Sequence, residues 1–292
     1  MKLATLFVEQ DTSALHLALD GGYAAVDDLA RAAGNERLQG MRDVADLFAR
    51  GDGVVEDLRA LANDARATVS FDDARLAPPV RRPSKIICVG LNYLAHIEES
   101  GGTRPERIVL FSKYPSSLVA SGDAVQLPSI TNELDYEGEL AIVIGRRTKG
   151  VSVEDAMGAI GGYTIMNDVS ARDLQGAESQ WVRGKALDTF APLGPVVLDA
   201  RSAPPIGEMR IRTTVNGEER QNALCSLMIT PVPDLISYIS AFVTLEPGDL
   251  IATGTPSGVA IGMDVPKFLE DGDVMVVAID EIGALTNTVV TA

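Results

Sequence analysis

The spacing of hydrophobic and polar positions differs between two parts of this chain. In residues 1–75, KLATLFVEQ and ALHLALD have the pattern of short strands, and helical stretches follow at 24–33, 40–50 and 53–67. In the last stretch, apolar residues recur at the spacing of a helix with one buried face. These residues therefore predict a small N-terminal α/β domain.

The segment LAPPVRRPSK, residues 76–85, interrupts this pattern with three prolines and three basic residues. Such a run has no periodicity that an element could use, and proline disfavours both helix and central strand. We interpret residues 76–84 as a linker. It separates the small domain from a larger domain over residues 85–292.

The larger domain consists mostly of short β-rich runs separated by Gly, Pro, Asn and Asp turns. Within VNGEER, Asn216-Gly217 is a strong hairpin signal. Helical patterns are fewer, and the clearest are VEDAMGAI (153–160) and PVPDLISYISAFV (231–243). Strands and helices do not alternate as in a βαβ fold, so the sequence predicts a β-rich α+β domain.

One predicted strand, LDYEGELAIVIG (134–145), carries Asp135, Glu137 and Glu139 at alternate positions. Alternate side chains share a face of a strand and lie about 6 to 7 Å apart. Two carboxylates at that spacing repel by roughly 2.5 kcal/mol at an effective dielectric constant near 20. Three explanations remain open: the face is solvated, a proton is taken up, or a cation binds there.

A further carboxylate follows a second apolar strand. In GGYTIMNDVSARDLQ (161–175) the strand pattern ends at Asn167, and Asp168 comes next. If Asp168 faces Glu137 and Glu139, three hard oxygen ligands come together. That set favours Mg²⁺ or Mn²⁺ over zinc, which prefers His or Cys.

The chain has two histidines, and their contexts differ. His16 lies in the alternating strand ALHLALD, opposite leucines, which predicts a surface position. His96 precedes Glu99 by three residues, so the two share a face if the segment is helical. A carboxylate bound to one imidazole nitrogen fixes the tautomer and strengthens the other nitrogen as a base. The alternative is an ordinary surface His-Glu pair.

The charge of the chain limits its partners and location. A formal net charge of −16 leaves no basic surface for nucleic acid. Cys88 and Cys225 lie in apolar contexts without a CxxC motif, which is typical of buried thiols in a reducing compartment. The apolar run at the start is too short for a signal peptide, and no run reaches the length of a membrane span. We therefore expect a cytoplasmic protein.

Six segments together resemble the fumarylacetoacetate hydrolase family and occur in that family's order. The resemblance covers nearly all of residues 83–292 and implies a mixed β-sandwich roll, usually assembled as a homodimer. The region before residue 76 resembles the small N-terminal domain of some bacterial members. The matching segments are VGLNYLAHIEES (89–100), LFSKYPSSLV (110–119), LDYEGELAIVIG (134–145), GGYTIMNDVSARDLQ (161–175), RGKALDTFAPLGPVV (183–197) and LIATGTPSGV (250–259).

The resemblance also implies roles for individual residues. The metal ligands would be Glu137, Glu139 and Asp168, with Asp135 at a less involved position. The catalytic groups would be His96, Glu99 and Lys185, with the His-Glu pair on a segment that closes over the substrate. The substrate contacts implied by the family are Arg172, Gln175, Thr255 and, at the border of the cavity, Lys113.

One departure from the family pattern affects the expected activity. Fumarylacetoacetate hydrolases proper have a fourth carboxylate ligand just upstream of the histidine, where this chain reads CVGLNY. The likeness therefore implies an acylpyruvase-type enzyme that uses Mg²⁺ or Mn²⁺ to hydrolyse a C–C bond in a 1,3-diketo acid. Oxaloacetate-type decarboxylation and 2-hydroxydienoate isomerisation remain alternatives, because both pass through the same enolate. A non-catalytic binding protein would be expected to lack a ligand or the lysine, and this chain has all of them.

Overall fold

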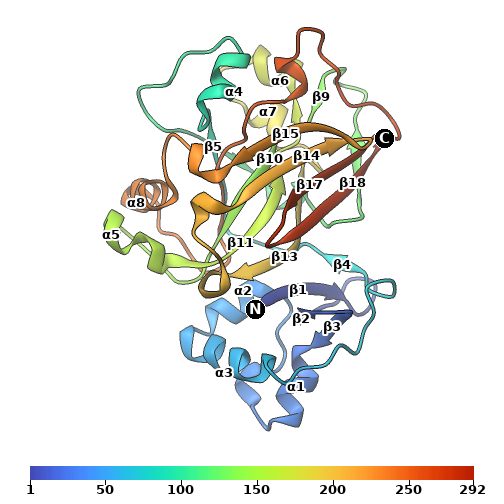
Figure 1. Cartoon of the computed structure of the whole chain (residues 1–292), viewed down its shortest axis with the longest axis vertical. Coiled ribbons are helices and arrows are strands. Elements are labelled where there is room, and N and C mark those ends of the chain that lie inside the picture. Colours follow the sequence, from blue (N-terminus) through green and yellow to red (C-terminus); the bar gives the residue numbers. More distant parts are fainter.

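The computed structural model describes residues 1–292 and contains two large β-sheets packed against each other (Figure 1). The larger sheet has eleven strands in the main order β3-β2-β1-β13-β11-β10-β16-β5-β6, with β4 beside β1 and β7 beside β13. Their bounds are β1 (Lys2–Phe7), β2 (Ser13–Leu19), β3 (Gly22–Ala25), β4 (Leu76–Ala77), β5 (Ile86–Gly90), β6 (Val109–Lys113), β7 (Leu118–Val119), β10 (Gly138–Ile144), β11 (Ile160–Asn167), β13 (Ala191–Asp199) and β16 (Leu250–Ala252).

The second sheet has five strands in the order β15-β14-β17-β18-β8. These are β8 (Ala124–Leu127), β14 (Arg210–Val215), β15 (Glu218–Leu224), β17 (Val274–Ile279) and β18 (Gly283–Thr291). A two-stranded ladder joins β9 (Leu134–Asp135) to β12 (Ser170–Ala171). Most neighbours are antiparallel, but β16 runs parallel to β5, β18 parallel to β8 and β7 parallel to β13. The predicted β-rich α+β class and mixed sandwich are confirmed.

The helices lie at the ends and side of this sandwich. Figure 1 shows α1–α3 at one end, with β1–β3, and α4, α6 and α7 at the other. The helices are α1 (Val26–Ala32), α2 (Val44–Ala49), α3 (Asp52–Ala62), α4 (Leu94–Glu99), α5 (Val153–Ala156), α6 (Arg172–Ala177), α7 (Val182–Lys185) and α8 (Val232–Phe242). Single 3₁₀ turns lie at η1 (Glu36–Leu38), η2 (Pro115–Ser117), η3 (Met157–Ala159), η4 (Ala200–Ser202), η5 (Ile206–Glu208), η6 (Cys225–Leu227) and η7 (Ala260–Gly262).

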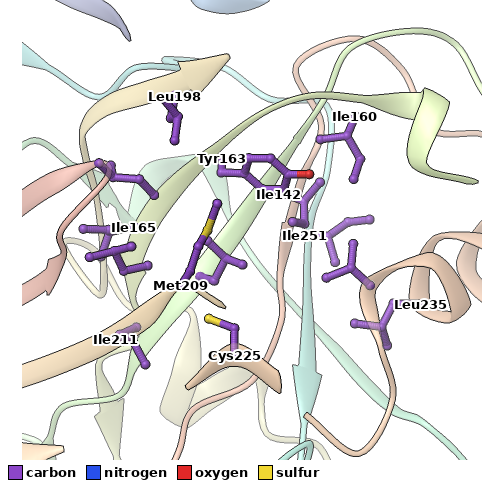
Figure 2. Packing of buried hydrophobic residues seen from close by; sticks show 14 of the residues in the cluster. Ile142, Ile160, Tyr163, Ile165, Leu198, Met209, Ile211, Cys225, Leu235 and Ile251 are labelled. Carbon is purple, nitrogen blue, oxygen red and sulfur yellow. The ribbon is translucent and has the colours of Figure 1, made fainter. Parts of the chain in front are cut away.

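The core between the sheets is a cluster of 30 buried residues, part of which Figure 2 shows. Ile142 on β10 and Ile165 on β11 face Ile211 on β14, so each sheet covers the apolar face of the other. Cys225 lies in this cluster, and Cys88 is also buried, which confirms the expectation of two buried thiols.

The N-terminal region is joined to the larger sheet. β1 pairs antiparallel with β13, and a second cluster of 25 buried residues includes Leu3, Leu47 and Leu58 together with Val143 and Leu250. Asp199, at the end of β13, forms an ion pair with Arg59 on α3, with 2.7 Å between Oδ2 and Nη2. The boundary between the two parts therefore runs through one continuous sheet and one apolar cluster.

The hairpin and two of the helices predicted from the sequence can be compared with the observed elements. Asn216 and Gly217 have positive φ angles of 53° and 81° and join β14 to β15, as the hairpin signal predicted. The helix expected over 53–67 begins at Asp52 and ends at Ala62. The helix expected over 24–33 begins only at Val26, because Gly22–Ala25 pairs with β2 as a strand.

One interpretation of the N-terminal region needs correction. His16 is not a surface residue: it is 3% exposed, and its Nδ1 lies 2.9 Å from the Ala14 carbonyl oxygen. The segment interpreted as a linker packs against the N-terminal strands. Its residues 77–80 are buried, β4 pairs with β1, and Thr5 donates a hydrogen bond to the Pro79 carbonyl. None of the helices has the length and apolar character needed to cross a lipid bilayer.

Independent folding of residues 85–292 stays a prediction. Because the cluster of 25 buried residues includes side chains from both parts of the chain, removing the N-terminal part should affect stability. A protein lacking residues 1–78 should keep its metal site, because the candidate ligands lie on and beside β10 and β11. It should unfold at a lower temperature than the full chain, since β13 loses its neighbour and apolar surface is exposed. Thermal unfolding and Mn²⁺ binding would test this, and a stable truncated protein without metal binding would contradict it.

Candidate active site

Three carboxylates come together where β10 and β11 lie side by side. Glu139 is on β10, Glu137 immediately precedes β10, and Asp168 immediately follows β11. The antiparallel register places Gly138 opposite Asn167, and the Asp168 amide donates to the Glu137 carbonyl at 2.8 Å. One oxygen from each side chain lies within 4.8 Å of the others. The buried group of three acids expected from the sequence is therefore present.

Asp135 does not belong to this group, although the alternation in the sequence predicted a shared face. The strand is interrupted at residues 136–137, and Asp135 lies on the separate strand β9. Its carboxylate accepts hydrogen bonds from Arg172 Nε at 2.9 Å and from the backbone amides of Ala260 and Ile261 at 2.9 and 3.1 Å. Asp135 thus connects α6 to the segment after β16.

Buried cations surround the carboxylates. Lys185 Nζ donates to Glu137 at 2.7 Å and to Asp168 at 2.9 Å. Lys113 Nζ donates to the other oxygen of Asp168, and Arg172 Nη1 lies 2.6 Å from Glu137. With Asp135 included, four carboxylates face three cations. The excess negative charge remains on Glu139, which forms no ion pair.

The pKa values of the buried carboxylates and of Lys185 reflect this imbalance of charge. Burial raises the pKa of Glu139 well above its usual value, and repulsion from Asp168 and Glu137 adds to the effect. For Glu137, burial also opposes ionisation, but Lys185 and Arg172 hold its pKa well below the usual range. Burial pulls the pKa of Lys185 down, yet Asp168 and Glu137 raise it overall. Glu139 is therefore the carboxylate that lacks a positive partner.

This donor set fits a divalent cation. Three carboxylates are hard oxygen ligands, and the unpaired charge of Glu139 can be neutralised by a bound cation. One Glu139 oxygen accepts from the Gly254 amide at 2.9 Å, which fixes the direction of the side chain. Glu137, Glu139 and Asp168 are the residues that could hold the metal.

A cavity of about 300 Å³ opens beside the carboxylates. Its polar wall contains most of the residues that the sequence assigned to the site, and its apolar wall includes Phe111 and Trp181. The polar lining includes His96, Glu137, Glu139, Arg172, Gln175, Lys185 and Thr255. Arg172 Nη1 donates to Gln175 at 3.1 Å, while Nη2 is buried without a hydrogen-bond partner.

His96 and Glu99 lie on α4 and face one another. His96 is 7% exposed, and its Nδ1 lies 2.9 Å from Glu99 Oε1. No protein group bonds to the other ring nitrogen, Nε2, and the residue lines the cavity. This is the arrangement that the sequence spacing predicted for an oriented base.

Two other assigned residues have contacts that qualify their roles. Thr255 lines the cavity, but its hydroxyl donates to the Gly138 carbonyl at 3.0 Å and accepts from Gln221 at 2.7 Å. A substrate oxygen would compete with Gly138 for that proton. Lys113 is fully buried behind Asp168 and is absent from the cavity wall, so its contacts orient a carboxylate rather than a substrate.

Sequence reasoning did not identify Gln221, Phe111 or Trp181 as site residues. Gln221 is on β15 of the second sheet, far from the other segments in sequence, and no local motif marks it. Trp181 is the single tryptophan of the chain, and its ring packs edge-to-face on Phe111 at 5.4 Å between centroids. A Cβ on Gly90 would lie 2.5 Å from the Trp181 ring, so a glycine is needed for this packing.

Comparison with known proteins agrees with the fold. The family described as Fumarylacetoacetate (FAA) hydrolase C-terminal matches residues 85–290, and this chain belongs to that family. The family consists of enzymes that act on small molecules.

Individual relatives are named for different reactions. The chain is 43% identical to oxaloacetate tautomerase YisK of Bacillus subtilis (strain 168) over 254 residues, 83% of this chain and 84% of that protein. Its structure is similar to fumarylacetoacetate hydrolase from Exiguobacterium antarcticum (TM-score 0.81, 35% identity), with 100% of both chains covered. It is also similar to maleylpyruvate hydrolase from Sphingobium sp. SYK-6 (TM-score 0.80, 30% identity), again with 100% of both chains covered.

Proposed function

We propose that this chain is a metal-dependent enzyme that interconverts the keto and enol forms of a small 2-oxo dicarboxylate such as oxaloacetate. The observation that carries the proposal is the position of His96 on the wall of the cavity that contains Glu137, Glu139 and Lys185. The similarity to an oxaloacetate tautomerase supports the choice of substrate.

The residues of the chain account for the proton transfer. Glu137, Glu139 and Asp168 would hold a divalent ion, which when bound would supply a Lewis acid toward the 2-oxo group. His96 Nε2 takes the proton from C3 of the keto form, so the C3–H bond breaks and a C2–C3 double bond forms. The same proton then passes to the oxygen on C2, and no other reactant is consumed. Glu99 holds Nδ1 and keeps Nε2 available as the base.

The cations of the cavity suit a substrate with two carboxylates. Lys185 stabilises the negative charge that develops on the enolate. Arg172 contributes Nη2, which is buried without a partner and can pair with a carboxylate. Gln175 holds the other side of the same guanidinium group.

The hydrolysis of acylpyruvates is a second candidate, favoured by the apolar wall of Phe111 and Trp181. An acyl tail can pack there, whereas a carboxylate cannot. In this reaction His96 takes a proton from water, and the hydroxide attacks the distal carbonyl. The C–C bond breaks to give a carboxylic acid and the enolate of the 2-oxo acid. Decarboxylation of oxaloacetate and isomerisation of 2-hydroxydienoates would use the same enolate.

A substrate panel tests these candidates directly. The purified protein with Mg²⁺ would be given oxaloacetate, acylpyruvates and a 2-hydroxydienoate. The absorbance of the enol, the release of pyruvate and the loss of the diketone would then be followed separately. We expect faster loss of the oxaloacetate enol than in buffer with Mg²⁺ alone, without stoichiometric pyruvate. Pyruvate formed in step with enol loss would favour decarboxylation, and acylpyruvate turnover alone would favour hydrolysis.

The assembly and location remain part of the proposal. We expect a homodimer in the cytoplasm, as the family resemblance and the composition suggested. Light scattering on the purified protein would test the first expectation.

A further inference from the structure

The Glu99 carboxylate is held on both of its oxygens. Oε1 contacts His96 Nδ1, and Oε2 accepts a hydrogen bond from the Gly258 amide at 2.8 Å. Gly258 belongs to a segment 159 residues further along the chain. The orientation of His96 is therefore connected, through one carboxylate, to residues 258–262, which we call the positioning segment.

Gly262 leaves the space that the Glu99 carboxylate occupies. A Cβ at Gly262 would lie 2.7 Å from both Cγ and Cδ of Glu99 and 2.8 Å from Oε2. Its φ angle lies outside the left-handed region, so residues other than glycine could adopt this backbone conformation. The need for glycine comes from contact with Glu99, not from the turn.

Asp135 also holds the positioning segment. Its buried carboxylate accepts hydrogen bonds from the amides of Ala260 and Ile261 and from Arg172 Nε. Hydrogen bonds to a charged carboxylate are among the stronger ones in proteins. The segment is thus bonded both to Asp135 on β9 and, through Gly258, to Glu99 on α4.

We propose that residues 258–262 are a positioning element for the reaction, in which Gly258 and Gly262 contact the Glu99 carboxylate so that it holds His96 in one orientation. Gly262 and Asp135 act through Glu99 and are positioning residues, since neither is assigned a contact with the reacting atoms. The inference rests on the proposed role of His96 as the base.

The substitution Gly262→Ala tests this with a single methyl group. The three heavy atoms nearest to it all belong to the Glu99 side chain, so we expect this side chain to move while the backbone stays in place. We expect kcat to fall about tenfold or more, a part of the 10²- to 10⁴-fold that a positioned acid–base group contributes. KM and the affinity for Mn²⁺ should change less than about twofold, since the metal ligands and the cationic residues of the cavity wall are untouched.

The double variant Glu99→Ala/Gly262→Ala separates positioning from general destabilisation. Glu99→Ala removes the three atoms nearest to the new methyl group, so the double variant should match Glu99→Ala in both kcat and melting temperature. This comparison also holds if Gly262→Ala alone folds poorly. The matched control is Gly53→Ala on α3, where the methyl would lie 3.1 Å from the flexible end of Arg37. It should leave kcat unchanged.

The outcomes distinguish this inference from the proposed function. Normal kcat in Gly262→Ala, with an inactive His96→Ala, overturns the positioning role alone. A multiplicative loss in the double variant also overturns it, because the two residues would then act independently. Normal turnover in His96→Ala contradicts the proposed base, whatever Gly262→Ala does.

Discussion

Chelation of divalent metal is expected to abolish turnover of every substrate, and Mg²⁺ or Mn²⁺ should restore it. The physical reason is the charge balance of the site, where four carboxylates face three cations and Glu139 has no positive partner. Activity before and after treatment with a chelator, together with metal analysis of the protein, would measure this. Full turnover in excess chelator, with no metal in the protein, would contradict the metal site.

The variant Glu139→Gln tests the same site through one ligand. Removing a charged ligand should weaken Mn²⁺ binding about tenfold or more. Loss of a group that is only hydrogen-bonded to a metal ligand already changes metal affinity on this scale. The metal-free protein should become more stable at neutral pH, because a buried carboxylate with a raised pKa opposes folding when ionised. The control Asp173→Asn removes a carboxylate near the surface of α6 and should leave Mn²⁺ affinity unchanged. A Glu139→Gln protein that binds Mn²⁺ as the wild type does would remove Glu139 from the ligand set.

The raised pKa of Glu139 also sets the sign of a pH effect. Metal binding requires the ionised carboxylate, so the affinity for Mn²⁺ should fall as the pH is lowered through that raised pKa. The fall should begin at a higher pH than an ordinary glutamate would give. In metal-free protein the sign is opposite: stability should increase as the pH falls through the same pKa, because protonation removes a buried charge. Titration calorimetry and thermal unfolding at several pH values would show both trends.

His96→Ala is expected to lower tautomerisation and acylpyruvate hydrolysis by about 10²- to 10⁴-fold, the usual contribution of a positioned base. Substrate binding should change little, because in the proposed reaction the metal site formed by the carboxylates, and not His96, binds the 2-oxo acid end. Decarboxylation of oxaloacetate should fall less, since loss of CO₂ needs no proton abstraction from carbon or water. Glu99→Gln should show the same pattern with smaller losses.

Lys185→Met provides the contrast to His96→Ala. It removes a charge next to Glu137 and Asp168 that, in our proposal, stabilises every enolate, so all reactions should fall together. The ratios between reactions are more informative than the absolute losses. If His96→Ala retains near-normal tautomerisation and hydrolysis, His96 only covers the cavity and the base lies elsewhere.

The sequence was sufficient to predict features that depend only on residues close together in the chain. The Asn216-Gly217 turn was predictable because its positive φ angles favour those two residues. The shared direction of Glu137 and Glu139 follows from the two-residue period of an extended chain, and the His96–Glu99 contact follows from the helical turn. The place of Asp168 beside them was a hypothesis, since it depends on the pairing of β10 with β11.

Tertiary contacts decided the features that the sequence misassigned or did not indicate. Asp135 leaves the acid group because the strand breaks before Gly138 and Arg172 lies close enough to pair with it. His16 is buried although the helices cover the other face of β2, which carries Leu15 and Leu17. Its partner on β1, Ala4, belongs to the cluster on the opposite face, where Val69 and Leu76 pack.

The sequence by itself determined the class of fold, the family and the candidate acidic residues of the site, because these follow from local periodicity and from motifs whose residues lie close together in the chain. Only the tertiary structure decided which charges balance one another. Glu139 remains unpaired because Lys113, Lys185 and Arg172, from three separate elements, pair with the other acids. The contact of Glu99 with Gly262 likewise joins segments far apart in the chain. Such contacts depend on packing between elements, and no local pattern encodes them.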